Sequence, residues 1–266
     1  MTTLAETFAR TRNQGRAALI GYLPAGYPSY AGCVDALVAM VEGGVDIVEV
    51  GLPYSDPLMD GPTIQEAVEA SLAGGTTTLD VLKTVEAVAA TAAATVVMSY
   101  WNPIERYGVV PFAEAMAAAG GAGVITPDLT PDEAGPWLAA VTAAGIDPVF
   151  LVAPSSTDAR IARVAEVTRG FVYAASTMGV TGVRDVVSDR AGTLVARVRP
   201  ATDLPISVGL GVSTGAQAAE VAAYADGVIV GSAFVRLLLD APDPASGVAA
   251  VRALAVELAA GVRAGR

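Results

Sequence analysis

The sequence predicts an α/β fold, a single (β/α)8 TIM barrel with extra terminal helices. Short β-branched runs alternate with longer alanine-rich helical segments along nearly all of the 266 residues. The alternation repeats eight times, and eight such units need about 250 residues. No proline- or serine-rich linker and no shift of composition divides the chain, so one domain over residues 1–266 is sufficient.

Each expected strand is a short run of β-forming residues bounded by turn formers. In chain order the strands are Ala17–Leu23, Val45–Val50, Thr95–Tyr100, Gly123–Thr126, Asp147–Val152, Gly170–Ala175, Leu204–Gly209 and Gly227–Gly231. The helical patterns that follow them are Tyr30–Glu42, Thr63–Ala73 with Leu79–Ala92, Pro111–Ala119, Pro131–Ala143, Asp158–Val167, Ser188–Val198, Ala216–Ala223 and Ala233–Leu239. The segments Met1–Arg16 and Ala249–Arg266 are expected to add the terminal helices.

The charge balance excludes several classes of partner. With 16 basic and 27 acidic residues the net charge is −11, which opposes binding to nucleic acid or to an anionic membrane surface. Polar residues break every long apolar stretch, so no membrane-spanning helix is expected. The lone cysteine, Cys33, cannot form an internal disulfide, and the polar N-terminus lacks the apolar core of a secretion signal. These features predict a cytoplasmic protein.

The absence of histidine restricts the chemistry. The commonest general base and the usual nitrogen ligand of zinc or iron are both missing, so no metal site is expected. The one lysine, Lys83, falls in a pattern typical of an outer amphipathic helix, which argues against a Schiff-base aldolase. Proton transfer must therefore come from carboxylates, tyrosines or the cysteine.

The second expected strand carries the first candidate catalytic residue. Alternation along Asp46–Val50 places Ile47 and Glu49 in the barrel interior. Active sites of such barrels lie at the C-terminal ends of the strands, and burial there raises the pKa of a carboxyl toward a range useful for proton transfer. The alternative is a structural ion pair, for which Arg184 is the main candidate partner.

The long segment 51–62 after this strand carries two further carboxylates and is stiffened by three prolines. Asp60 directly precedes Gly61 and Pro62 at the start of a helix, so it is either a turn or capping residue or a second catalytic group. Asp56 is either a turn residue or a contact for a partner chain.

Glycines end the seventh and eighth strands, at Gly209 with Gly211 and at Gly231 before Ser232. Glycine lets backbone N–H groups approach a ligand, and the N-terminus of the helix from Ala233 favours an anion. Strand-end glycines are also ordinary turn formers, but their occurrence at the two strands that usually hold phosphate predicts a phosphate site.

The polar, glycine-containing segment 176–184 after the sixth strand is either a lid over the substrate or simply a mobile loop. In a lid, the Thr181 hydroxyl would reach a carboxylate of segment 51–62. The Gly182 N–H would join the phosphate site.

Four strand ends together resemble the tryptophan synthase alpha subunit family. The likeness extends from about Ala18 to Leu238 and is carried by residues 48–65, 179–182, 209–213 and 231–233. It implies a carbon–carbon lyase that cleaves indole-3-glycerol phosphate to indole and glyceraldehyde 3-phosphate. It also implies an alpha2beta2 assembly in which a beta chain holds pyridoxal phosphate and joins the indole to serine, so this chain itself needs no cofactor.

The resemblance implies a role for each candidate residue. Glu49 is the general acid–base residue, and Asp60 is the second catalytic carboxylate, held ionised by Thr181 to accept the indole N–H. The implied phosphate ligands are Gly182, Gly209, Gly211, Gly231 and Ser232, with Tyr173 nearby. The implied indole pocket consists of Tyr22, Tyr100, Ile125 and Leu151. The residues implied to face the beta chain are Pro53, Asp56 and the Asn102–Pro103 turn.

Two positions depart from the usual family pattern. Tyr22 stands where an apolar aromatic residue is expected in many relatives. The loop 127–131 lacks the proline that more often follows Asp-Leu, so we expect a changed turn that keeps Asp128 as a buried hydrogen-bonding residue.

Other phosphate-binding barrels fit this sequence less well. Triose-phosphate isomerases and ribulose-phosphate epimerases rely on histidine, and indole-glycerol-phosphate synthases rely on lysines. Barrels of histidine biosynthesis place paired aspartates at strands one and five, but here strand one ends in Gly21-Tyr22-Leu23 and strand five in Val152-Ala153. Two alternatives stay open: a free-standing lyase that releases indole, and a non-catalytic alpha-like subunit that only activates its beta partner.

Overall fold

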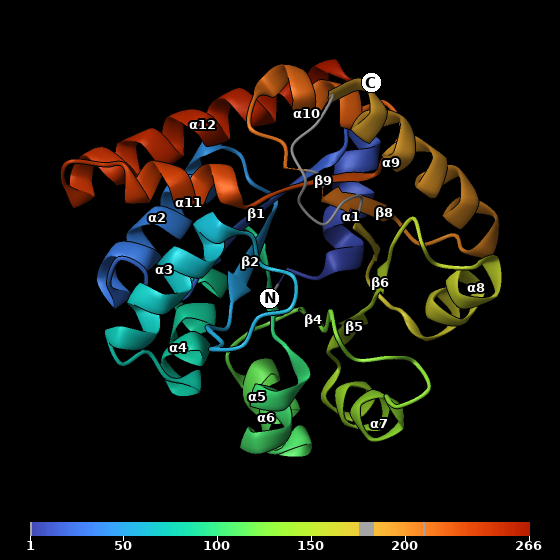
Figure 1. Ribbon diagram of the computed structural model, residues 1–266, viewed down its shortest axis with the longest axis horizontal. Helices are drawn as coiled ribbons and strands as arrows, with labels where there is room; N and C mark the ends of the chain where they lie inside the picture. Colours follow the sequence, from blue (N-terminus) through green and yellow to red (C-terminus); the bar gives the residue numbers. More distant parts are fainter. Residues whose placement is uncertain (1, 176–183, 210) are drawn as a thin grey trace.

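The computed structural model describes residues 2–175, 184–209 and 211–266, and for residues 184–189 it describes the backbone only. Parallel strands form the interior of the molecule and helices surround them (Figure 1). The strand order is β5-β4-β3-β2-β1-β9-β8-β7-β6. The strand bounds are β1 Ala18–Pro24, β2 Ile47–Gly51, β3 Ala94–Met98, β4 Gly123–Ile125, β5 Asp147–Val149, β6 Leu151–Val152, β7 Val172–Ala175, β8 Ile206–Gly209 and β9 Gly227–Val230.

The short strands β5 and β6 are the two halves of the expected fifth strand, with Phe150 between them. β5 pairs with β4, and β6 pairs with β7. This stretch of chain therefore pairs with β4 before Phe150 and with β7 after it, and so connects the two ends of the sheet. The Phe150 carbonyl accepts the Tyr173 N–H at 3.2 Å. The nine assigned strands thus form the predicted eight-stranded barrel.

The helices follow the predicted order, with some different bounds. They are α1 Leu4–Asn13, α2 Tyr30–Gly43, α3 Pro62–Ala73, α4 Thr78–Ala89, α5 Trp101–Tyr107, α6 Val109–Ala118, α7 Gly135–Ala144, α8 Asp158–Val167, α9 Arg184–Val198, α10 Gly215–Ala222, α11 Ser232–Leu239 and α12 Pro244–Ala264, with a 3-10 turn at Arg199–Ala201. The prediction of a turn at Asn102–Pro103 was wrong, because these residues lie in the first turn of α5. Proline is tolerated there, since the first N–H groups of a helix have no partner within it.

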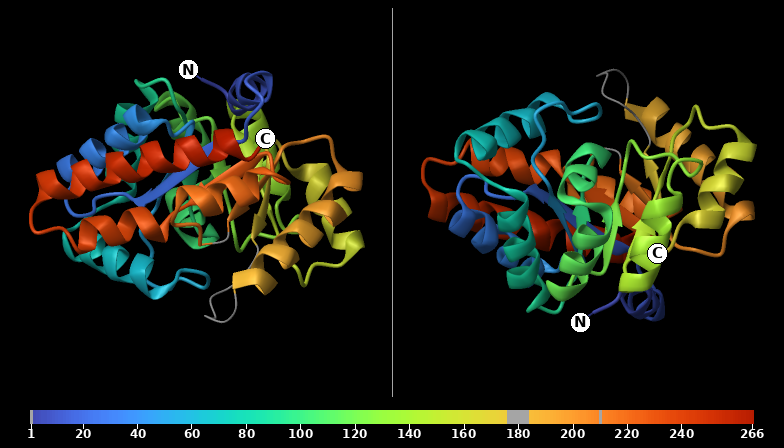
Figure 2. Two further views of the ribbon diagram at one scale, coloured as in Figure 1. Left: turned by 90° about the horizontal axis from the view of Figure 1, so that it is seen from above. Right: turned by 90° about the horizontal axis from the view of Figure 1, so that it is seen from below.

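The last helix also starts earlier than predicted. Asp243 accepts the Ser246 N–H at 2.9 Å and caps α12, which begins at Pro244, five residues before the expected start at Ala249. Among the described residues this is the one helix whose length and hydropathy would also suit a membrane span. It packs along α2, α10 and α11 on the outside of the barrel, and Figure 2 shows α11 and α12 side by side.

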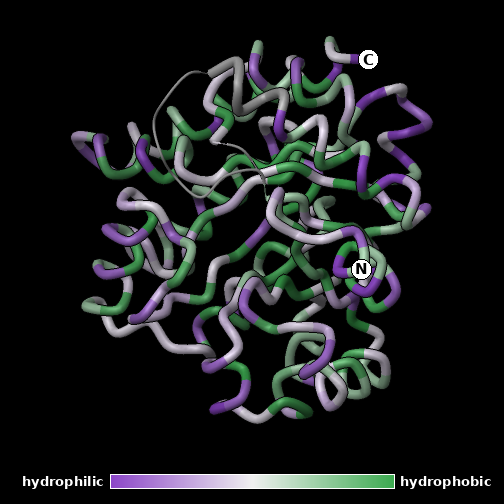
Figure 3. The backbone as a smooth tube through the Cα atoms, turned by 45° about the vertical axis from the view of Figure 1, so that its right-hand side comes forward, coloured by the Kyte–Doolittle hydropathy of each residue, from purple (hydrophilic) through white to green (hydrophobic). Residues whose placement is uncertain are grey.

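The core has two layers, in accordance with the alternation of side chains along the strands. Val48 and Val50 pack into the layer between strands and helices, whereas Ile47 lies in the cluster inside the barrel. Figure 3 shows hydrophobic residues along the central strands and hydrophilic stretches mainly in the surrounding segments. Leu4 and Phe8 of α1 join the inner cluster, so α1 closes one end of the barrel.

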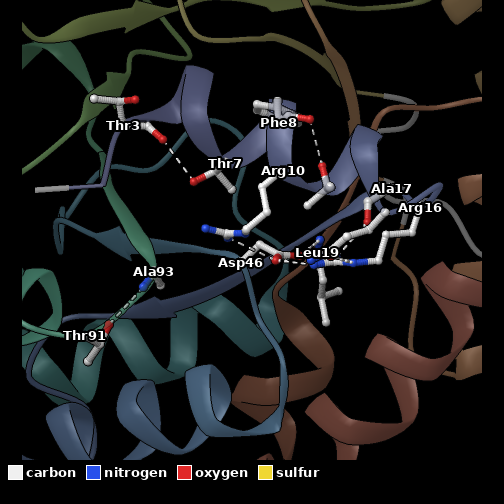
Figure 4. Close-up of polar contacts among 12 residues, drawn as sticks. Thr3, Thr7, Phe8, Arg10, Arg16, Ala17, Leu19, Asp46, Thr91 and Ala93 are labelled. Atoms are coloured by element: carbon white, nitrogen blue, oxygen red, sulfur yellow. Dashed lines mark hydrogen bonds and ion pairs between the residues drawn. The ribbon is translucent and has the colours of Figure 1, made fainter.

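A buried ion pair attaches the chain after α1 to that same end (Figure 4). The Arg16 guanidinium donates to both oxygens of Asp46 at 2.6 and 2.8 Å, and the Leu19 N–H donates to Asp46 at 3.0 Å. Asp46 directly precedes β2, so the pair lies at the N-terminal ends of the strands. The loop between β2 and α3, residues 52–61, lies at the opposite end (Figure 2).

Candidate active site

The structure places Glu49 inside the barrel, near the C-terminal end of β2. The residue is 1% exposed and pairs in register with Tyr22 of β1 and Val96 of β3. No hydrogen bond or ion pair joins its Oε2 to any described residue. Burial and, to a lesser extent, the charge of Asp60 raise the pKa of Glu49 to about 8. Glu49 is therefore a neutral acid at neutral pH, and the Arg184 side chain proposed as its structural partner lies outside the described residues.

Asp60 lies in the β2–α3 loop and is partly buried. Its carboxylate Oδ1 accepts the Tyr100 hydroxyl at 3.1 Å. The capping interpretation of Asp60 was wrong, because Gly61 is the N-cap residue of α3 and no side chain caps that helix. Burial raises the pKa of Asp60, and the Tyr100 hydrogen bond opposes this rise. The charge on Asp60 helps to raise the pKa of Glu49, so an ionised Asp60 favours the protonated form of Glu49.

Tyr100, just after β3, is the described hydrogen-bond partner of the Asp60 carboxylate. Its hydroxyl also accepts the Met59 N–H at 2.9 Å, and its ring packs on Tyr54 with ring centroids 5.4 Å apart. These contacts hold both the backbone and the carboxylate of the β2–α3 loop. Sequence analysis missed this role, although the position of Tyr100 at the end of the neighbouring strand was a usable signal. The Thr181 contact expected for Asp60 lies outside the described residues.

Two more tyrosines enclose the carboxylates. A Cβ atom on Gly51 would overlap with the Tyr22 hydroxyl, and a Cβ atom on Gly209 would overlap with the Tyr173 hydroxyl. Each ring therefore needs a glycine on the neighbouring strand. The charges of both carboxylates help to raise the pKa of each tyrosine, after burial itself. Ile125 and Leu151 belong with Tyr173 to the cluster inside the barrel, so apolar side chains lie around these polar groups.

The glycines at the ends of β8 and β9 come together, because these two strands are neighbours. Gly211 has a φ of +72°, a conformation that favours glycine, and a Cβ atom there would meet nothing within 4 Å. Gly231 is the N-cap residue of α11, which starts at Ser232 and has no side-chain cap. Its first N–H groups thus suit an anionic ligand. Gly182, also expected at the phosphate, lies outside the described residues.

The residues expected to face a partner lie around a groove at the outer side of the β2–α3 loop. The groove has a volume of about 480 Å³ and is lined by Leu52, Pro53, Tyr54, Thr76, Thr77, Thr78, Asn102, Pro103, Arg106 and Tyr107. Asp56 is exposed and accepts the Ser55 hydroxyl at 2.6 Å. Leu58 in the same loop is 75% exposed.

Asp128 was expected to be a buried hydrogen-bonding residue, and the structure confirms only the hydrogen bond. It accepts the Trp101 N–H at 2.8 Å, as a hydrogen-bonding residue should, but its side chain is exposed and not buried. The bond joins the loop after β4 to the start of α5. In residues 2–175, 184–209 and 211–266, no group of three or more His, Cys, Asp or Glu side chains could hold a metal ion.

Comparisons with known proteins agree with this geometry. A family model described as Tryptophan synthase alpha chain matches residues 8–263. The tryptophan synthase alpha chain of Thermobifida fusca is 60% identical, over 99% of each chain, and that of Acidothermus cellulolyticus is 61% identical, over 99% of this chain and 98% of the relative. The solved Mycobacterium tuberculosis tryptophan synthase superposes with a TM-score of 0.91 at 55% identity, over 99% of each chain. This chain belongs to the tryptophan synthase alpha chain family.

Proposed function

We propose that this chain is the alpha subunit of tryptophan synthase and cleaves indole-3-glycerol phosphate to indole and glyceraldehyde 3-phosphate. The observation that carries the proposal is the buried carboxyl of Glu49, whose pKa is raised to about 8, beside Asp60. A proton donor of that kind suits a carbon–carbon cleavage that needs no metal or Schiff base. The presence of both carboxylates argues against a purely activating, non-catalytic subunit.

The cleavage needs two proton transfers and one charge to be stabilised. The neutral Glu49 carboxyl gives its proton to C3 of the indole, which leaves a positive charge on the ring nitrogen. The resulting Glu49 carboxylate then takes the proton of the hydroxyl on the carbon bonded to C3. As that hydroxyl becomes an aldehyde, the bond to C3 breaks and its electron pair returns to the indole ring. Glu49 is protonated again at the end of the cycle.

Asp60 acts on the ring nitrogen. Its ionised carboxylate accepts the indole N–H and stabilises the positive charge that develops there. The Tyr100 hydroxyl, 3.1 Å from the Asp60 carboxylate, orients this group, and the bond to the Met59 N–H holds the loop that carries it. We propose that Thr181 contributes a second contact when the substrate is bound.

The rest of the substrate contacts the residues that surround the two carboxylates. The indole ring lies against the apolar and aromatic side chains of Tyr22, Tyr100, Ile125 and Leu151. The phosphate binds to backbone N–H groups at the ends of β8 and β9, with Tyr173 beside the glycerol chain. The residues assigned to the phosphate are Gly182, Gly209, Gly211, Gly231 and Ser232.

We further propose an alpha2beta2 assembly, in a cytoplasmic enzyme. The beta chain holds pyridoxal phosphate and converts the indole to tryptophan. Pro53, Asp56, Asn102 and Pro103 face this chain, at the groove beside the β2–α3 loop. The support for this surface is the groove itself, because Pro53, Asn102 and Pro103 line it together with other residues of the loop that carries Asp60.

Turnover of indole-3-glycerol phosphate with and without the beta chain tests the function. We expect slow release of indole by this chain alone and strong activation when the beta chain is added. Full speed without the beta chain would identify a free-standing lyase. Absence of cleavage under both conditions, with a folded chain, would refute the proposal. Glu49→Gln is the matched inactive control, because it keeps the size of the side chain and removes the transferable proton.

A further inference from the structure

Three tyrosines lie near the two carboxylates, and the hydroxyl of Tyr22 has no partner there. The Tyr100 hydroxyl bonds to Asp60 and to the Met59 N–H. Tyr22 is 7% exposed, and no hydrogen bond joins its hydroxyl to another described residue. The hydroxyl oxygen is not among the fully buried unpaired atoms, so it is the accessible end of a buried ring. A partner for this hydroxyl is therefore to be sought within the site.

The direction of the Tyr22 side chain indicates this partner. Tyr22 of β1 pairs in register with Glu49 of β2, and both side chains point into the barrel. Its hydroxyl lies against Gly51, where a Cβ atom would overlap with it. Gly51 is two residues beyond Glu49, on the same face of the same strand. The phenol thus reaches across from β1 to the position next to the Glu49 side chain, whose Oε2 is itself unpaired and buried.

The surroundings keep this hydroxyl protonated. Burial raises the pKa of Tyr22 well above its ordinary value, and the charges on Asp60 and Glu49 raise it further. Tyr100 and Tyr173 are the other titratable groups that act on it. No cation is among these groups, so the Tyr22 hydroxyl keeps its proton and is able to donate a hydrogen bond.

We propose that Tyr22 is a positioning residue whose hydroxyl donates a hydrogen bond to Glu49 while that carboxylate is without its proton. The inference rests on the proposed proton cycle, in which Glu49 is an anion between its two transfers. At that moment the negative charges of Glu49 and Asp60 lie close together in a site shielded from water. A neutral hydrogen-bond donor directed at Glu49 stabilises its ionised form. In the resting state Glu49 is protonated, and the Tyr22 hydroxyl makes no hydrogen bond to it.

Tyr173 is the obvious competitor for this role, and the geometry separates the two. The Tyr173 hydroxyl also has no hydrogen bond to another described residue, and the charge of Glu49 also raises its pKa, but it lies against Gly209 of β8, on the side of the expected phosphate site. The Tyr22 hydroxyl lies against β2, the strand that carries Glu49. Tyr173→Phe is therefore the matched control for Tyr22→Phe, since each change removes one buried oxygen and keeps the ring.

The test measures the titration of Glu49 directly. Carbon-13 NMR of carboxyl-labelled glutamate, in wild type and in each variant, follows Glu49, and the signal is assigned by its loss in Glu49→Gln. Tyr22→Phe is expected to raise the pKa of Glu49 by about one unit, because a hydrogen bond to a charged group favours the ionised form by about that much. Tyr173→Phe is expected to raise it by less than half as much. No rise in Tyr22→Phe, or an equal rise in both variants, would overturn the proposal.

Kinetics with the beta chain present supply the second measurement. Tyr22→Phe is expected to lower kcat for indole-3-glycerol phosphate about tenfold and to change KM less than twofold, because during turnover the bond forms only after Glu49 has given its proton to bound substrate. A loss confined to KM would show that the hydroxyl binds substrate instead, and would also overturn the proposal. If Glu49→Gln retained normal turnover, the proposed function itself would fail, which is a different result from an unchanged Tyr22→Phe.

Discussion

Glu49 should make the barrel less stable as the pH rises, and Glu49→Gln should abolish this dependence. The pKa of Glu49 is raised from an ordinary 4.5 to about 8 by burial and by Asp60. Below pH 4.5 the carboxyl is protonated in both the folded and the unfolded chain, so its ionisation does not affect the free energy of unfolding. Between these two values the unfolded chain releases the proton while the folded chain keeps it, so the free energy of unfolding falls. Above pH 8 the whole cost is present.

The size of the effect follows from the two pKa values. At about 1.4 kcal/mol for each pKa unit, the rise from 4.5 to about 8 corresponds to about 5 kcal/mol at high pH. Relaxation of the site around an ionised carboxylate reduces this value, so about 5 kcal/mol is its upper limit. Glutamine adds an amide with a burial cost of its own, but that cost does not change with pH. The slope against pH, rather than the stability at any one pH, is therefore the informative quantity.

Urea unfolding of wild type and Glu49→Gln at intervals from pH 5 to pH 9 measures this slope. The stability of the variant minus that of wild type is expected to grow by up to about 1.4 kcal/mol for each pH unit and to level off above pH 8. Glu220→Gln changes an exposed carboxyl on α10 in the same way and is the control, for which parallel profiles are expected. Parallel profiles for Glu49→Gln as well would refute the burial argument on which the catalytic assignment rests.

Three further predictions address the loop, the phosphate site and the closed end of the barrel. Tyr100→Phe removes the hydroxyl donor to Asp60 and should lower kcat about tenfold at a cost of about 1 kcal/mol in urea unfolding; unchanged kcat would contradict the positioning role. Gly211→Glu puts a charged side chain at a φ of +72° beside the expected phosphate, and should weaken glycerol phosphate binding more than tenfold in calorimetry; unchanged affinity would remove this position from the site. Arg16→Met leaves Asp46 buried without its bidentate partner and should destabilise the chain by about 3 kcal/mol with KM unchanged; stability equal to wild type would show that the pair is dispensable.

The repeat of strand and helix, and the side of each strand that faces inward, followed from the sequence. Alternation along β2 was enough to place Glu49 inside the barrel, because successive side chains of a strand point to opposite faces. The glycines at the ends of β8 and β9 were located from the expected bounds of those strands rather than from alternation. Local patterns were less reliable where one motif suits two structures. The Asn102–Pro103 pair suggested a turn but starts α5, and Asp60 preceded a helix without capping it.

Only the tertiary structure decided what surrounds each of these groups. The hydrogen bond from Tyr100 to Asp60 joins residues 40 positions apart, and it depends on the pairing of neighbouring strands. The same holds for the pKa of Glu49, which depends on burial and on a charge from another segment. The Tyr22 hydroxyl lies against Gly51 for the same reason, since the register of β1 on β2 brings the two together. Periodicity is a property of nearby residues, whereas distances and solvation across a barrel arise only when distant segments pack.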